Sequence, residues 1–178
     1  MAFTWTVVPA PAPIGALTIG VTDIGLALVA FGDHPEAAEK AAAKLGEPLE
    51  QGAATDAVAA ELAEYFAGRR TTFDVPLDWR LTSAGSQRRV LASLYETVGY
   101  GAVVTYGELA ERSGLGKAYT AARGVGSIMG SNPIPVVVPC HRVMASDGLG
   151  GFGGGRPTKE WLLGLEGVLT PALDFGLD

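Results

Sequence analysis

The sequence predicts an α+β protein in which an antiparallel sheet with helices is followed by a mostly helical C-terminal half. Three short runs of apolar and β-branched residues come first, helical periodicity dominates from residue 83 onward, and apolar residues make up 48% of the chain. A length of 178 residues corresponds to about one domain, or two small ones sharing a core. We expect domain limits at 1–82 and 83–178.

The N-terminal half has the pattern of an antiparallel meander. Its strands are separated by Pro- and Gly-rich turns and are expected at Phe3–Val8, Leu17–Val21 and Leu26–Phe31. Alanine- and lysine-rich residues 36–45 predict a helix, and apolar residues at helical spacing between 58 and 66 predict a second one. Residues 72–81 predict a further strand with its exit turn.

The C-terminal half begins with an apolar stripe between residues 90 and 98 that predicts a helix. Thr105 and Glu108 have the spacing of a capping box, which opens a short helix through Ser113. A glycine turn follows, and residues from Lys117 to about Met129 predict a second short helix. Two short helices joined by a glycine turn are the helix-turn-helix pattern, and an ordinary helical hairpin is the competing interpretation.

The rest of this half places Cys140 between a predicted buried segment and a glycine-rich loop. Residues 136–138 predict a short buried extended segment that leads into Pro139 and Cys140. Six glycines between 148 and 155 predict a loop, and residues 157–166 predict a closing helix.

Composition excludes several classes of protein. One cysteine forbids an internal disulfide, and two histidines with that cysteine cannot build a Cys-rich zinc site. No apolar run approaches the length of a membrane span and no basic, then apolar, leader is present, so we expect a soluble cytoplasmic protein. The net charge is −6, but residues 1–83 carry five basic and 11 acidic residues whereas 84–167 carry eight and six. A nucleic-acid face would therefore lie in the second half, with few phosphate contacts.

Cys140 directly precedes His141, which is the only histidine outside the N-terminal half. A free thiol has a pKa of about 8.5, and a neighbouring imidazole can accept its proton, directly or through one water. Glu166 could be the carboxylate that fixes the imidazole tautomer. The alternative is a buried cysteine that behaves as a small hydrophobe, beside a histidine satisfied in its loop.

The segment Pro139-Cys140-His141-Arg142-Val143 resembles the active-site motif of the O6-alkylguanine-DNA alkyltransferases. Asn132-Pro133-Ile134-Pro135 precedes it, and the glycine-rich loop and Lys159-Glu160-Trp161-Leu162-Leu163 follow it, as in that family. The close match spans about residues 84–167. The resemblance implies a ribonuclease-H-like layout of the N-terminal half and a helix-turn-helix that binds duplex DNA.

The resemblance also implies a single-turnover repair reaction, in which a flipped guanine loses its O6-alkyl group to the cysteine. O4-alkylthymine is a further possible substrate, no cofactor or metal is needed, and the protein is expected to be a monomer. By similarity Cys140 is the acceptor, His141 the base acting through a water, and Glu166 the residue that orients His141. Tyr106 contacts the flipped base and can protonate the leaving purine.

The remaining roles are also implied by the resemblance. Arg123 corresponds to the arginine that fills the space left by the flipped base, and a solvated or phosphate-contacting arginine is the alternative. Arg142 is expected to form an ion pair that links the domain halves. The other expected DNA contacts are Ala122, Gly126 and Ser127, and the expected pocket residues are Asn132, Pro135, Val143, Phe152 and Gly153.

Phe152 and Gly153 depart from the tyrosine and serine common in the family, so a hydroxyl contact to the base is lost. Three other functions stay open from the sequence. The first is a lesion-binding protein without transfer, against which the presence of Cys140 argues. The second is a cysteine hydrolase, for which adjacent Cys and His are an unusual arrangement. The third is a self-alkylating protein with a different alkyl donor.

Overall fold

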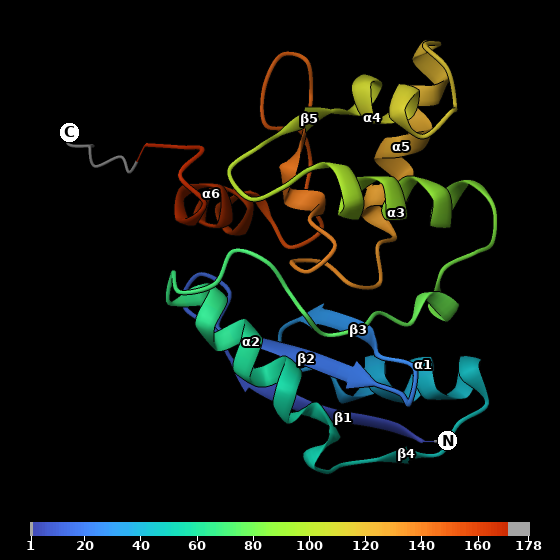
Figure 1. The fold of residues 1–178 in the computed structure, drawn as a ribbon, viewed down its shortest axis with the longest axis vertical. Coiled ribbons are helices and arrows are strands. Elements are labelled where there is room, and N and C mark those ends of the chain that lie inside the picture. Colours follow the sequence, from blue (N-terminus) through green and yellow to red (C-terminus); the bar gives the residue numbers. More distant parts are fainter. Residues whose placement is uncertain (1, 171–178) are drawn as a thin grey trace. The chain divides into compact units, whose positions relative to one another are not determined.

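The first three strands form the predicted antiparallel meander. β1 (Phe3–Pro9) pairs with β2 (Ala16–Val21), and β2 pairs with β3 (Leu26–Phe31). The short β4 (Leu49–Glu50) joins the other edge of β1 in parallel, so the sheet has the order β3-β2-β1-β4 (Figure 1). The computed structural model describes residues 2–170.

Two helices complete the N-terminal part, as the periodicity predicts. α1 (Pro35–Leu45) and α2 (Asp56–Phe66) each bury one face. The buried face of α1 consists of small side chains, which allows the helix to lie close to the sheet. Ala38, Ala41 and Ala42 of α1 form a buried core cluster with Phe3 of β1 and Ala27 of β3.

Gly20 in β2 is required by the packing of Phe3. A Cβ atom at this position would lie 2.3 Å from a carbon of the Phe3 ring, which is itself fully buried. The ring therefore occupies the space that any other residue at position 20 would need.

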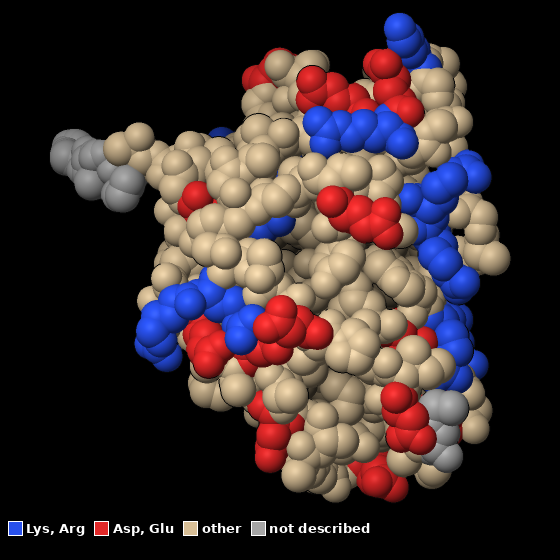
Figure 2. All heavy atoms as spheres, viewed as in Figure 1, with Lys and Arg blue, Asp and Glu red and all other residues tan. Residues whose placement is uncertain are grey.

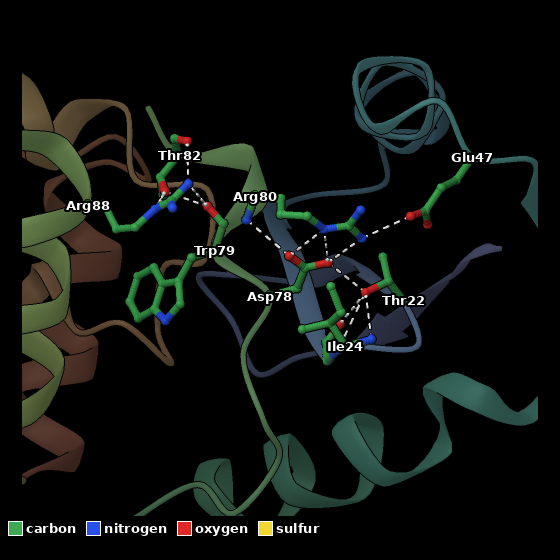
Figure 3. Close-up of polar contacts among 9 residues, drawn as sticks. Thr22, Ile24, Glu47, Asp78, Trp79, Arg80, Thr82 and Arg88 are labelled. Atoms are coloured by element: carbon green, nitrogen blue, oxygen red, sulfur yellow. Dashed lines mark hydrogen bonds and ion pairs between the residues drawn. The ribbon is translucent and has the colours of Figure 1, made fainter. Parts of the chain in front are cut away.

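The prediction of a strand over residues 72–81 is wrong. This segment makes one isolated parallel bridge, between Leu77 and Leu26, and then forms a short 3₁₀ helix, Trp79–Leu81. Side-chain contacts hold it in place of a ladder. The Asp78 carboxylate accepts hydrogen bonds from the Thr22 hydroxyl at 2.6 Å and from the Arg80 guanidinium at 2.7 Å (Figure 3).

The Asp78 contact is buried and extends to a third segment. Asp78 is 1% exposed, and Arg80 also donates to Glu47 Oε2 at 2.9 Å. Burial alone would raise the pKa of Asp78, but hydrogen bonds from Arg80 and Thr22 outweigh it and the pKa is lowered. The Asp78–Arg80 ion pair thus holds the backbone around residue 78, where the β-ladder does not continue.

The C-terminal helices agree with the predicted pattern. They are α3 (Ser86–Thr97), α4 (Tyr106–Arg112), α5 (Tyr119–Gly130) and α6 (Arg156–Leu165). Two short strands, β5 (Val104–Thr105) and β6 (Val143–Met144), pair in parallel. The mixed α+β class is therefore confirmed. Among residues 2–170, no helix is both long and apolar enough to cross a membrane.

The chain divides into two compact units. One contains the residues up to Arg88 together with Pro133–Val137, and the other contains Arg89–Asn132 and the chain from Val138 onward. The Val29 amide donates to the Pro133 carbonyl at 2.9 Å within the first unit. The domain limits 1–82 and 83–178 stay a prediction.

The predicted capping box opens α4. The Glu108 amide donates to Thr105 Oγ1 at 3.1 Å, and the Thr105 amide donates to Glu108 Oε1 at 2.8 Å. Both contacts satisfy amides that the first turn of a helix leaves without partners. They also fix the start of the helix at Tyr106.

Residues 136–138 are buried, as predicted, but the extended conformation is wrong. The segment is a turn, and Val136 has a φ of 75°, in the left-handed region. A β-branched residue rarely adopts this conformation, so the surrounding packing must hold it. Val136 is 1% exposed, which is consistent with that constraint.

Candidate active site

Cys140 begins a 3₁₀ helix, Cys140–Arg142, directly after Pro139. The Cys140 amide donates to the Val138 carbonyl at 2.8 Å, and Asn132 Nδ2 donates to the same carbonyl at 2.9 Å. Asn132 also hydrogen-bonds the thiol and thereby lowers its pKa, against a larger effect of burial. Its side chain therefore supports both the backbone before the cysteine and the sulfur.

The thiol lies at a pocket of about 180 Å³. The walls come from the start of α4, the end of α5 and the glycine-rich loop. The lining residues are Tyr106, Gly126, Met129, Gly130, Cys140, Gly151, Phe152 and Gly153. Small residues dominate this set, which leaves room beside the sulfur for a flat group and its substituent.

Tyr106 is a pocket side chain that contacts the glycine-rich loop. Burial raises its pKa, while the backbone of Gly151 hydrogen-bonds the hydroxyl and lowers it. Gly150 has a φ of +76°, and a Cβ atom there would lie 2.8 Å from the Tyr106 hydroxyl. Glycine at position 150 is therefore needed both for the backbone conformation and for the approach of Tyr106.

Behind the cysteine, three side chains form a buried ionic cluster. His141 Nε2 lies 2.9 Å from Glu166 Oε2, and Arg142 donates to both Glu166 oxygens at 2.8 and 2.9 Å. Arg142 Nη1 also donates to the Val98 carbonyl at 2.8 Å. The ion pair expected for Arg142 is thus present, but its partner Glu166 belongs to the same unit instead of linking the domain halves.

The cluster fixes the protonation states. Burial would raise the pKa of Glu166, but hydrogen bonds and charge from His141 and Arg142 lower it to about 2. Burial lowers the pKa of His141, so the imidazole is neutral near pH 7. Since the Glu166 carboxylate accepts from Nε2, the proton of the neutral ring is on Nε2 and Nδ1 is the free acceptor. His141 Nδ1 has no hydrogen-bond partner in the part of the chain that the structure describes.

Lys159 has no role of its own in the sequence prediction, and the structure places it beside the site. Its side chain is fully buried, and Nζ donates to the carbonyls of Val143 at 2.7 Å, Leu149 at 2.5 Å and Gly151 at 3.2 Å. Burial lowers the pKa of Lys159 to about 8, and its charge favours the ionised form of Cys140. The signal was present in the sequence, because Lys159 lies on the apolar stripe of α6 one turn before Leu162 and Leu163.

The pocket brings together five of the predicted site residues and leaves others outside its lining. Tyr106, Gly126, Cys140, Phe152 and Gly153 line it. Three of the residues expected in the pocket do not line it. Asn132 donates to the Val138 carbonyl, Val143 is fully buried with its carbonyl bound by Lys159, and Pro135 is buried in the other compact unit.

The residues predicted to contact DNA lie on α5. Arg123 and Ser127 are exposed, and Ala122 and Gly126 are half-buried. Arg123 forms no ion pair with any carboxylate among residues 2–170; its guanidinium lies 5.8 Å from the centroid of the Tyr119 ring. On the face drawn in Figure 2, basic and acidic side chains lie against one another in several places, and uncharged surface lies between these groups.

Comparison with known proteins gives two family models that match most of the chain. Residues 85–168 match the 6-O-methylguanine DNA methyltransferase, DNA binding domain, and residues 8–79 match the ribonuclease-like domain of the same name. A solved Mycobacterium tuberculosis O6-methylguanine methyltransferase is 34% identical, with a TM-score of 0.74 and coverage of 96% of both chains. The chain belongs to the 6-O-methylguanine DNA methyltransferase family.

Other 6-O-methylguanine DNA methyltransferase relatives extend the comparison. The Mycobacterium tuberculosis OGT in complex with DNA is 33% identical, with a TM-score of 0.73, and the match covers 93% of this chain and 92% of that one. A methylated-DNA--protein-cysteine methyltransferase of Mycolicibacterium paratuberculosis is 49% identical over 113 residues, 63% of this chain and 65% of the relative. That of Rattus norvegicus is 49% identical over 85 residues, 47% of this chain and 39% of the relative. The alignments thus span less than two thirds of these curated relatives, and the family resemblance stated from the motif is confirmed.

Proposed function

We propose that this protein repairs DNA by moving a methyl or other alkyl group from O6 of guanine in duplex DNA to the sulfur of Cys140. The observation that carries the proposal is the position of the only cysteine, which lies at a pocket and directly precedes a histidine bound to a buried carboxylate. The DNA complex of a relative and the matched DNA-binding model support DNA as the partner.

The reaction is a displacement at the alkyl carbon. The S–C bond to Cys140 forms as the C–O6 bond of the guanine breaks, so no water is consumed and no other reactant is needed. The thiol proton leaves the sulfur and one proton ends on the departing purine, which leaves as guanine. A thioether cannot be turned over by the same groups, so each molecule reacts once.

The thiol needs a base. Burial raises the pKa of Cys140 to about 11, so roughly one thiol in ten thousand is ionised at pH 7. In our proposal His141 Nδ1 accepts the proton, directly or through one water, and the Glu166 carboxylate stabilises the imidazolium that forms. Arg142 keeps Glu166 ionised and in place.

The flipped guanine is held in the pocket beside the sulfur of Cys140. Tyr106 is within the lining, and its hydroxyl can give a proton to the leaving purine. Phe152 supplies an apolar face for the base where a tyrosine is common in the family, and backbone amides of the glycine-rich loop can replace the lost hydroxyl.

The DNA duplex binds against α5. Ala122, Gly126 and Ser127 are small, which allows the helix backbone to approach a groove closely. Arg123 takes the space of the flipped guanine and offsets part of the unstacking cost. Contacts of this kind do not depend on base sequence, as a repair protein requires.

The test is intact mass spectrometry after incubation with a duplex that contains one O6-methylguanine. We expect a gain of one methyl group per molecule, absent in Cys140→Ala and absent with an undamaged duplex. Binding to the damaged duplex without a gain of mass would overturn transfer and leave a lesion-binding protein. Repeated release of product with unmodified Cys140 would indicate a hydrolase.

A further inference from the structure

α5 begins with an exposed aromatic residue. Tyr119 is 77% exposed, whereas the other exposed large hydrophobic side chains of the described residues are between 37% and 45% exposed. It is the only aromatic residue of α5, as Arg123 is its only charged one. No part of the mechanism above uses this ring.

Tyr119 and Arg123 are four residues apart and share one face of the helix. Side chains of a helix lean toward its N-terminus, so Arg123 extends back over Tyr119. The guanidinium carbon lies 5.8 Å from the ring centroid, within the range of a cation–π contact.

Little else on this helix can hold the arginine. The residues between the two are Thr120, Ala121 and Ala122, and Gly124 and Gly126 follow. Arg123 forms no ion pair in residues 2–170. A free arginine side chain has many rotamers, and fixing it on DNA removes that freedom.

We propose that Tyr119 is a positioning residue for Arg123: its ring restricts the guanidinium to the exposed face of α5, ready to enter the duplex. The inference rests on the proposed function, since it assumes that Arg123 acts on DNA. It predicts an effect on reaction with duplex DNA and none on the chemistry at Cys140.

The experiment measures the rate constant of Cys140 alkylation with two substrates: a duplex with O6-methylguanine, and the free base O6-benzylguanine. Tyr119→Ala should slow the reaction with the duplex about 2- to 5-fold, the equivalent of one exposed cation–π contact. The rate with the free base should be unchanged, because a free base needs no arginine. Tyr119→Phe, which keeps the ring, should retain the wild-type rate, and Tyr119→Leu should behave like the alanine variant.

Double substitution separates positioning from an independent DNA contact. In Arg123→Ala, a further Tyr119→Ala change should have no effect on the duplex reaction. Equal rates of wild type and Tyr119→Ala, a faster rate for the variant, or additive losses in the double variant would each refute the inference. A wild-type protein that reacts with neither the duplex nor the free base would instead refute the proposed function.

Discussion

Replacement of Glu166 by glutamine tests the buried cluster most directly. The carboxylate accepts three hydrogen bonds, at 2.8 and 2.9 Å from Arg142 and 2.9 Å from His141, and its side chain is 0% exposed. An amide lacks the charge and offers one acceptor oxygen. Arg142, which is 7% exposed, would then be a buried charge without its counter-ion, and only its hydrogen bond to the Val98 carbonyl would stay unchanged.

Breaking a buried ion pair on one side costs about 3–5 kcal/mol in the free energy of unfolding. At about 2–4 °C per kcal/mol for a chain of this size, Tm should fall by about 6–20 °C. Equilibrium unfolding in urea and a thermal melt measure both quantities. The variant should also transfer the methyl group more slowly at low temperature, because the imidazolium of His141 loses its counter-charge.

Glu160→Gln is the matched control, because Glu160 pairs with Arg156 at 3.0 Å on the exposed face of α6, the helix that ends directly before Glu166. Such a pair contributes no more than about 1 kcal/mol. If Glu166→Gln and Glu160→Gln lose the same small amount of stability, the buried cluster does not stabilise the fold and the reasoning is wrong.

Three further predictions follow from the same unit. The folded-state pKa of Glu166 is lowered to about 2 from an ordinary 4.5. Its ionisation therefore stabilises the fold on the order of 3 kcal/mol, which is complete above about pH 4.5 and is lost as pH falls toward 2. Urea unfolding at pH 7 and pH 3 should show a smaller difference in free energy of unfolding between wild type and Glu166→Gln at pH 3, and a constant difference would contradict this. Lys159→Met should slow the reaction of Cys140 with iodoacetamide below about pH 8, where Lys159 is protonated, because a cation that favours the thiolate is removed. An unchanged pH profile would exclude that role. Gly150→Ala should slow methyl transfer at least several-fold, because the added Cβ atom would displace Tyr106 and a φ of +76° is strained for alanine. Wild-type kinetics would show that the loop adapts without cost.

Much of the fold follows from local signals in the sequence. The meander, α1, α2 and the capping box of α4 each depend on residues within a few positions of one another, where periodicity and hydrogen-bonding capacity decide the outcome. The motif around Cys140 is equally local, which is why it identified the family.

The errors and omissions have one physical cause, which is contact between distant parts of the chain. Residues 72–81 contain β-type residues, yet Asp78 binds Thr22, 56 positions away, and this contact replaces a ladder. Val136 takes a left-handed conformation that its own preference opposes, because buried packing holds it.

From the sequence alone, most of the helices and strands and the family can be predicted, and Cys140 with its adjacent histidine is the candidate nucleophile. The surroundings of Cys140 depend on contacts that only the folded chain makes. The contact between Glu166 and His141, 25 positions apart, agrees with the role that the family resemblance implies. The sequence does not indicate the three carbonyls that accept hydrogen bonds from the ammonium of Lys159, a residue type that is almost never fully buried without partners. These contacts form because burial makes an unpaired charge costly, so each buried ion must find partners that no local pattern specifies.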